Sequence, residues 1–159
     1  MSTNFKTFTG NLVGSPATHP ISDQVGAFCY QHTPDGLKFL LVTSSRGRWI
    51  LPKGWPMKKH TSAEVALAEA WEEAGVADGV VSRDPALSYD SMKHTKKRGT
   101  IFTRVAVHTI AVTRLEDVFP EADDRARRWA TLAEAERRVS EENLLTAIRA
   151  LASQVSIKA

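Results

Sequence analysis

Three glutamates with helical spacing are the residues of this 159-residue chain best suited to chemistry. Glu69, Glu72 and Glu73 lie three and four positions apart, so on a helix their carboxylates share an arc of roughly 100°. Like charges this close repel one another, and the C-terminal end of a helix also disfavours anions. A hard divalent cation would relieve the repulsion, and Mg²⁺ takes oxygen ligands and shares phosphate groups. On spacing alone, a solvated acidic helix face is the alternative interpretation.

The helix that must carry these glutamates has a clear start and a clear end. Thr61 and Glu64 form a capping-box pattern, and Gly75 supplies a stop, so the sequence predicts a helix over residues 61–75. The side chains expected to dock this helix on a sheet lie opposite the carboxylates: Leu67, Ala70, Trp71 and Ala74. The prediction is therefore an apolar face against the sheet and an acidic face toward solvent or a ligand.

The other predicted elements alternate between strands and helices. Strands are expected over residues 24–31, 37–43, 49–51, 79–90 and 100–113, and helices over residues 132–139 and 142–153. Polar, basic loops are expected over residues 46–49 and 91–99. This order predicts an α+β fold, with a mixed β-sheet sandwiched between α-helices. It also predicts an N-terminal arm over residues 1–22, loose or irregular, and one domain over residues 23–155.

Basic residues are the candidate ligands for an anionic substrate. The net charge is +3 and the isoelectric point is about 9.2, so the balance alone does not specify a partner. Arginine suits bidentate phosphate contact and lysine point-charge contact. The candidates flank the acidic helix or precede the longest strand: Arg46, Arg48, Lys53, Lys93, Lys96, Lys97 and Arg98. For residues 93–98 a solvated loop is the alternative, and Arg125 is expected to pair with nearby acidic residues such as Glu121.

Composition excludes several classes of protein. The single cysteine, Cys29, cannot form an internal disulfide and predicts a reducing compartment, with the cytoplasm as default. No run of 18 apolar residues occurs, so no membrane span is expected, and residues 1–20 do not form a secretory signal. A nucleic-acid partner is not predicted either, because the sequence shows neither a recognition helix nor an aromatic platform.

A longer motif surrounds the three glutamates. The run from Gly54 to Val76 resembles the Nudix box, in which Gly, Glu, Arg-Glu, Glu-Glu and Gly occur at fixed spacing. The matching positions are Gly54, Glu69, Ala70, Glu72, Glu73, Gly75 and Val76. His60 stands where the family has its first Glu, and Ala68 stands where it has Arg. Those two family side chains can pair, so losing both leaves no orphan charge and the fold should survive.

The resemblance implies a Nudix fold and a metal-dependent hydrolase that cleaves a phosphoanhydride bond. Mg²⁺, or Mn²⁺, is the implied cofactor, with Glu69, Glu72, Glu73 and a backbone carbonyl at Lys53 or Gly54 as metal ligands. Glu72 and Glu73 are the implied catalytic residues, and Glu72 is either a ligand or the base that takes a proton from water. The loop conformation at Gly54 is expected to require glycine. A monomer or homodimer is expected.

The resemblance extends to the diphosphoinositol-polyphosphate and diadenosine-polyphosphate branch of the family. The similar parts are the first hairpin, the run Arg-Trp-Ile-Leu-Pro-Lys-Gly-Trp starting at Arg48, and the Arg-Arg-Trp before a late helix. A small phosphorylated substrate is therefore implied. Three alternatives stay open: a general hydrolase of nucleoside-diphosphate derivatives, a Nudix-fold binding module that has lost activity, and a basic nucleic-acid binder.

Overall fold

Strand β7 (Gly99–Leu115) is the central, longest strand of the sheet, and three other strands pair with it along its length. The computed structural model describes residues 21–157. Strand β1 pairs with β7 in parallel, whereas β5 and β6 pair with it antiparallel, so the sheet is mixed. The remaining strands are β1 (Ile21–Thr33), β2 (Gly36–Thr43), β3 (Trp49–Ile50), β4 (Lys53–Gly54), β5 (Val76–Val81), β6 (Leu87–Thr95) and β8 (Arg127–Ala130).

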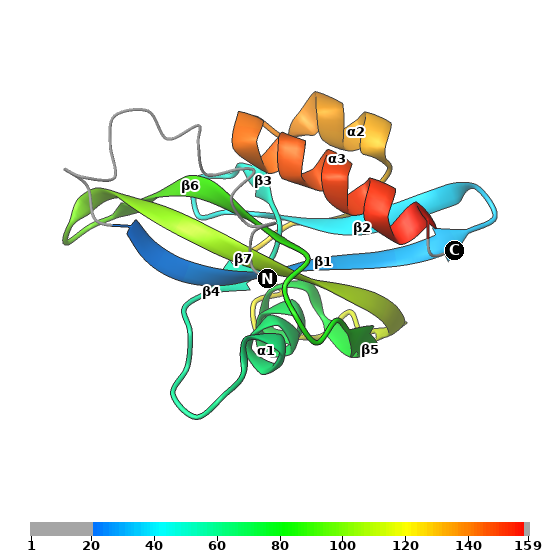
Figure 1. Cartoon of the computed structure of the whole chain (residues 1–159), viewed down its shortest axis with the longest axis horizontal. Coiled ribbons are helices and arrows are strands. Elements are labelled where there is room, and N and C mark those ends of the chain that lie inside the picture. The colour runs from blue at the N-terminus through cyan, green and yellow to red at the C-terminus, as the bar shows by residue number, and fades with distance from the viewer. Residues whose placement is uncertain (1–20, 158–159) are drawn as a thin grey trace.

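Helices cover both faces of this sheet. Helix α1 (Ser62–Ala74) packs on one face against β1, β4 and β5, while α3 (Glu142–Ile157) lies over β6 on the other face. Helix α2 (Leu132–Arg138) packs beside α3 (Figure 1). The predicted α+β fold, a mixed sheet sandwiched between helices, is confirmed.

The first hairpin forms as the sequence predicts. Strands β1 and β2 pair antiparallel around a turn closed by Gly36, whose φ of 112° is accessible mainly to glycine. Buried apolar side chains from both strands build the centre of the core, and the Phe28 and Phe39 rings lie 4.9 Å apart. Cys29 lies in this core as a buried free thiol.

Two predictions about the middle of the chain are wrong. Residues 79–90 do not form one strand, because the chain leaves the sheet around Pro85 and returns as β6. Proline has no N–H to donate to a strand partner, which favours this break. Of residues 91–99 only 96–98 form a turn: β6 continues to Thr95, and the hairpin closes at Gly99 with a φ of 65°. Their polar side chains suggested a loop, but the strand pairing uses backbone groups, which do not depend on side-chain polarity.

The ends of the chain test fewer predictions. The N-terminal arm predicted over residues 1–22 lies outside the described residues except for its last two, which begin β1. In the described part, residues 21–157, no helix is both long and apolar enough to cross a bilayer.

Candidate functional site

Helix α1 is fixed at both ends, which sets the position of the glutamates. The Thr61 hydroxyl accepts a hydrogen bond from the Glu64 N–H at 3.1 Å, and the Glu64 carboxylate accepts one from the Thr61 N–H at 2.9 Å. The predicted capping box is thus confirmed. Gly75 ends the helix in the left-handed conformation, with a φ of 74°. The Arg127 guanidinium donates to the last helical carbonyl, that of Ala74, at 2.9 Å.

A buried histidine ties the start of α1 to the sheet. His108 of β7 is fully buried, and its Nδ1 lies 2.8 Å from the Ser82 carbonyl, so Nδ1 carries the proton. Nε2 is then free to accept from the Ser62 hydroxyl at 2.8 Å. Burial lowers the pKa of His108, which keeps the ring neutral and suited to this role. No local sequence pattern predicts this contact, because His108 and Ser62 lie 46 positions apart.

The face of α1 that docks on the sheet differs from the predicted one. Its buried residues are Val65, Ala66, Ala70, Glu73 and Ala74, whereas Trp71, predicted to dock, is 36% exposed. The buried face of the helix is therefore rotated toward the glutamates. It begins at Val65, and Glu73 lies within it. Small alanine side chains let the helix approach the sheet closely, which encloses the Glu73 carboxylate. Glu72 lies on the exposed side.

Glu73 is the most enclosed carboxylate of the site. Its Oε1 accepts a hydrogen bond from the Lys53 N–H at 3.2 Å, and its Oε2 lies 3.4 Å from an Arg125 guanidinium nitrogen. Burial raises the pKa of Glu73 to about 8, against the opposing effect of Arg125. An additional positive charge beside this carboxyl group would stabilise its ionised form and lower its pKa.

Glu69 lies beside Glu73 and depends on Gly54. A Cβ at position 54 would overlap the Glu69 carboxylate, so a residue other than glycine would displace this carboxylate from its present position. The φ of Gly54 is not positive, so glycine is required for space and not, as predicted, for an unusual loop conformation. Burial raises the pKa of Glu69, and the charge of Glu72 raises it further, while a hydrogen bond with Glu73 lowers it.

The carboxylate pair fits a hard divalent cation. Two partly buried carboxyl groups with raised pKa values face the backbone at Gly54, and a cation would remove the cost of ionising both. Within residues 21–157 no group of three acidic, His or Cys side chains is arranged to hold a metal ion. A two-carboxylate donor set suits Mg²⁺, which keeps several waters and shares substrate phosphates. Glu72 as a further ligand stays a prediction.

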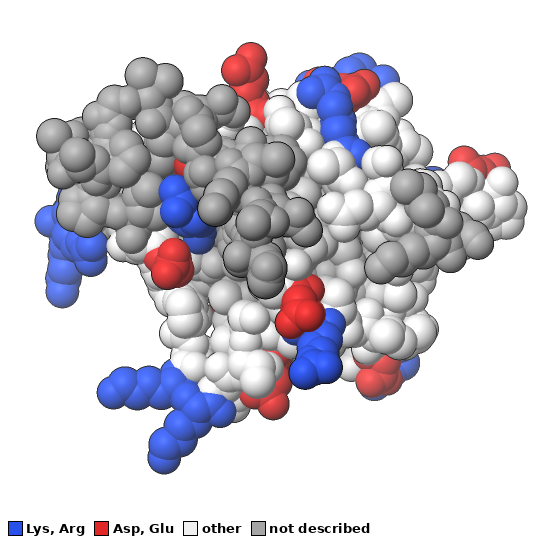
Figure 2. Space-filling view, viewed as in Figure 1, with Lys and Arg blue, Asp and Glu red and all other residues white. Residues whose placement is uncertain are grey.

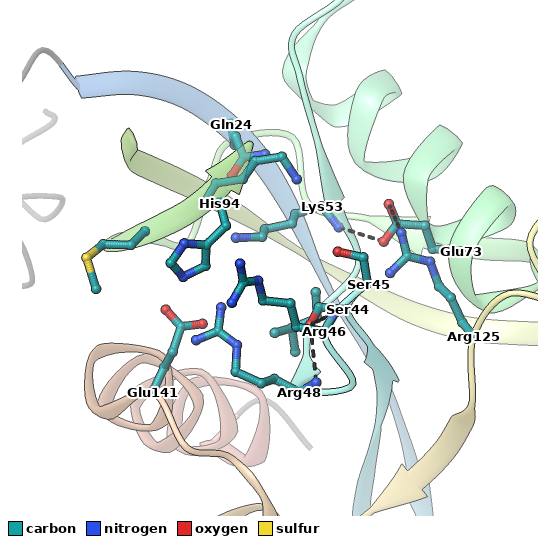
Figure 3. A pocket seen from close by; sticks show the side chains of 13 residues that line it. Gln24, Ser44, Ser45, Arg46, Arg48, Lys53, Glu73, His94, Arg125 and Glu141 are labelled. Carbon is teal, nitrogen blue, oxygen red and sulfur yellow. Dashed lines mark hydrogen bonds and ion pairs between the residues drawn. The ribbon is translucent and has the colours of Figure 1, made fainter. Parts of the chain in front are cut away.

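A cavity of about 150 Å³ adjoins this pair and is lined by several lysine and arginine side chains (Figure 3). Four of its cationic side chains were predicted to bind substrate: Arg46, Arg48, Lys53 and Lys93. A turn directs the first two. The Ser44 hydroxyl accepts from the N–H groups of Arg46 and Arg48 at 3.3 and 3.2 Å. Partly buried Lys53 has a lowered pKa because burial disfavours its charge. The Glu141 carboxylate opposes this shift, and Lys93 and Arg48 lower the pKa further.

The other predicted cations lie elsewhere. Lys96, Lys97 and Arg98 form the tip of the β6–β7 hairpin, where all three are exposed, and none of them lines the cavity. Figure 2 shows Lys and Arg side chains extending into solvent at this end of the molecule. The structure thus brings Arg46, Arg48, Lys53 and Lys93 together at the cavity and leaves the hairpin tip apart from them.

Two cavity residues were missed as site residues. Arg125 was expected only to pair with nearby acidic side chains, and it does pair with Glu121 at 2.7 Å. It also donates to the Thr43 carbonyl at 2.7 Å, and this contact with β2 holds its guanidinium beside Glu73 in the cavity wall. Glu141, just before α3, lines the opposite end of the cavity (Figure 3). No local sequence signal marks either residue, because strand pairing and helix docking bring them in.

Comparison with known proteins assigns the chain to a family. Nudix hydrolase 4 of Arabidopsis thaliana is 32% identical over 100 residues, which are 62% of this chain and 46% of that protein. Nudix hydrolase 21, chloroplastic, of the same plant is 30% identical over 117 residues, which are 70% of this chain and 56% of that protein. The C. elegans Ap4A hydrolase shares the fold, with a TM-score of 0.62 at 15% identity, over 85% of this chain and 98% of that chain.

The chain belongs to the Nudix hydrolase family. It spans about half the length of the curated relatives it matches. No protein-family model matches the sequence.

Proposed function

We propose that the protein is a divalent-cation-dependent hydrolase that cleaves a phosphoanhydride bond in a small polyphosphorylated substrate. The observation that supports this proposal is that a pair of carboxylates lies next to a cavity lined by cationic side chains. The carboxylates of Glu69 and Glu73 meet a cavity rich in lysine and arginine, and Glu73 belongs to both. A cation at the carboxylates and the cavity side chains would together surround a pyrophosphate with positive charge.

The residues divide into two roles. Glu69, Glu73 and the backbone at Gly54 would hold Mg²⁺ or Mn²⁺, and Glu72 would be a further ligand or the base. Such a cation neutralises phosphate charge and lowers the pKa of an attacking water. Arg46, Arg48, Lys53 and Lys93 would hold the phosphates that do not react, which places the reacting phosphorus near the carboxylates.

Two substrate classes agree with the site: diphosphoinositol polyphosphates and dinucleoside polyphosphates. The sequence resembles the branch of the family that acts on both, and a shared fold with an Ap4A hydrolase agrees with the second. The second candidate function is a binding module with weakened activity, because His60 and Ala68 replace the family's Glu and Arg. A cytoplasmic location, a monomeric or homodimeric state and the absence of nucleic-acid binding stay predictions.

Phosphate release from a panel of these compounds tests the proposal. Turnover should require Mg²⁺ or Mn²⁺ and stop with a chelator. Glu73→Gln should lose about 100-fold or more in kcat, as expected when a group that stabilises the transition state is removed. Glu134→Gln, in the capping box of α2 and outside the cavity, is the control and should keep wild-type turnover. If no compound is hydrolysed while the protein still binds them, the weakened binding module becomes the better account.

A further inference from the structure

The carboxylate of Glu141 is unusual in its surroundings. It lies in a cavity whose other described lining residues include Arg46, Arg48, Lys53, Lys93 and Arg125. Figure 3 shows it at the far end from Glu73, with Lys53 and the guanidinium groups of Arg46 and Arg48 in between. A cavity that served only to hold phosphates would gain from a cation at this place, because a carboxylate repels phosphate.

Glu141 is also held in position. The Ser91 hydroxyl of β6 donates a 2.6 Å hydrogen bond to its Oε2. Within the described residues, Oε1 accepts no hydrogen bond from another side chain. The side chain is thus fixed by one oxygen and presents the other as an acceptor. A group with a hydroxyl or amino hydrogen would satisfy this oxygen, and hydrogen bonds to a charged acceptor are the stronger kind.

A second cavity, of about 350 Å³, begins at the same residue. It shares Arg48, Met92 and Glu141 with the first cavity, so the two cavities adjoin at these side chains. Its other lining residues, within the described part of the chain, are Asp90, Ser91, Phe102, Ser140, Glu142 and Asn143. Apart from the shared Arg48, apolar, hydroxyl, amide and acidic groups therefore stand where the first cavity has cations. A lining of this kind suits an uncharged group with hydrogen-bond donors, and the volume lies in the range of small-molecule sites.

We propose that Glu141 is a specificity-determining residue, and that the second cavity receives an uncharged, donor-bearing group attached to the polyphosphate, of the nucleoside class. This inference rests on the proposed function, since the first cavity must hold the polyphosphate. The Glu141 carboxylate accepts a hydrogen bond from a ribose hydroxyl or a base amino group. It repels a substrate that carries phosphate on every side, such as a fully phosphorylated inositol ring. Dinucleoside polyphosphates are then preferred over diphosphoinositol polyphosphates.

Substrate preference tests the proposal. We expect wild-type protein to favour diadenosine tetraphosphate over a diphosphoinositol pentakisphosphate. Glu141→Gln should lower kcat/KM about tenfold for the dinucleotide, through KM, and leave the inositol compound unchanged or improved. Glu141→Lys should reverse the preference. The matched control is Glu136→Gln, because Glu136 is exposed, pairs with Arg149 and lines neither cavity. Thermal melting of each variant verifies that it is folded.

Two outcomes would overturn the proposal. A similar fall in kcat for both substrates would make Glu141 a general base, and unchanged kinetics would deny it any role. If wild-type protein hydrolyses neither compound, the proposed function fails and binding decides instead. Titration calorimetry with adenosine 5′-monophosphate should then show binding that Glu141→Gln weakens about tenfold and Glu136→Gln does not. Absence of binding, or equal binding by both variants, would sink the second-cavity assignment by itself.

Discussion

The two ends of the cavity are built in different ways. At the carboxylate end, Glu69 and Glu73 come from one helix and Gly54 from the strand just before it, all within 20 residues. At the cation end, Arg48 follows β2, Lys93 lies on β6 and Glu141 precedes α3, so three distant segments must meet. The first end depends on close packing around one helix. The second depends on the sheet topology, so individual side chains there should be easier to replace.

The closest packing gives the largest expected effect. Gly54→Ala would drive a Cβ into the Glu69 carboxylate, so we expect cation affinity and activity to fall about 100-fold, as for other losses of support around a metal ligand. Activity assays and Mn²⁺ titration measure both losses. Glu69→Ala alone should lose at least as much, and adding Gly54→Ala to it should cost little more. Losses that multiply in the double variant would show that Gly54 acts independently of Glu69.

The cation end should respond more mildly. Arg48→Ala removes one of several cations that line the cavity, so we expect KM to rise about tenfold with little change in kcat, the pattern of lost uniform binding. Steady-state kinetics at fixed Mg²⁺ measure this split. Arg83→Ala, at an exposed position in the β5–β6 connection, provides the reference for losing one arginine. A fall in kcat without a rise in KM would place Arg48 in the chemical step instead.

The enclosure of Glu73 predicts a pH-dependent stability in the metal-free protein. Its pKa of about 8 in the folded state exceeds the ordinary value of 4.5, so the folded protein holds a proton that the unfolded chain releases. The stabilisation is therefore complete below about pH 4.5 and is lost as pH rises through about 8, on the order of 2–4 kcal/mol. Denaturant unfolding in chelator across pH 5–9 measures it.

A matched pair of variants isolates that effect. Glu73→Gln should flatten the decline in the free energy of unfolding between pH 5 and pH 9, whereas Glu72→Gln should keep it, because Glu72 is exposed. Adding Mg²⁺ near pH 8 should restore stability in proportion to its binding. An equally steep decline in Glu73→Gln would mean that another group titrates.

The hairpin tip provides the smallest expected effect. Replacing Lys96, Lys97 and Arg98 together by alanine should change kcat/KM by about twofold or less at physiological salt, because exposed charges outside the cavity are screened. Kinetics at low and physiological salt measure it. A tenfold or larger loss at both salt concentrations would mean that these side chains contact the substrate, as predicted from the sequence.

Local sequence signals predicted the carboxylate end well. The Thr61 and Glu64 pattern, the stop at Gly75 and the glutamate spacing place α1 to within a residue. The rotation of the helix about its axis was predicted only in part. Ala70 and Ala74 dock as predicted and Leu67 packs against the core, but the sheet also receives Val65 and Ala66 in place of Trp71. Trp71 stays at the surface, and Glu73 is enclosed.

The site residues that could not be predicted from the sequence reach the cavity through the topology of the sheet. Strand β8 was not predicted, yet its pairing with β2 brings the preceding Arg125 against Thr43 and Glu73. Glu141 reaches the cavity because α3 docks on β6, and its bond to Ser91 spans 50 positions. Arg46 and Arg48 line the cavity and could be predicted to lie near the motif, because they lie in a short turn beside it. Long-range contacts such as those of Arg125 and Glu141 leave no periodic pattern in a single sequence.

Cation binding tests the central claim most directly. Calorimetric titration of Mn²⁺ into wild-type protein, with and without methylenediphosphonate as a non-hydrolysable pyrophosphate, should show binding that the diphosphonate strengthens. Glu73→Gln should weaken that binding at least tenfold, and Glu136→Gln should not. No binding by wild-type protein in either condition, or equal binding by Glu73→Gln, would contradict a cation site between Glu69 and Glu73.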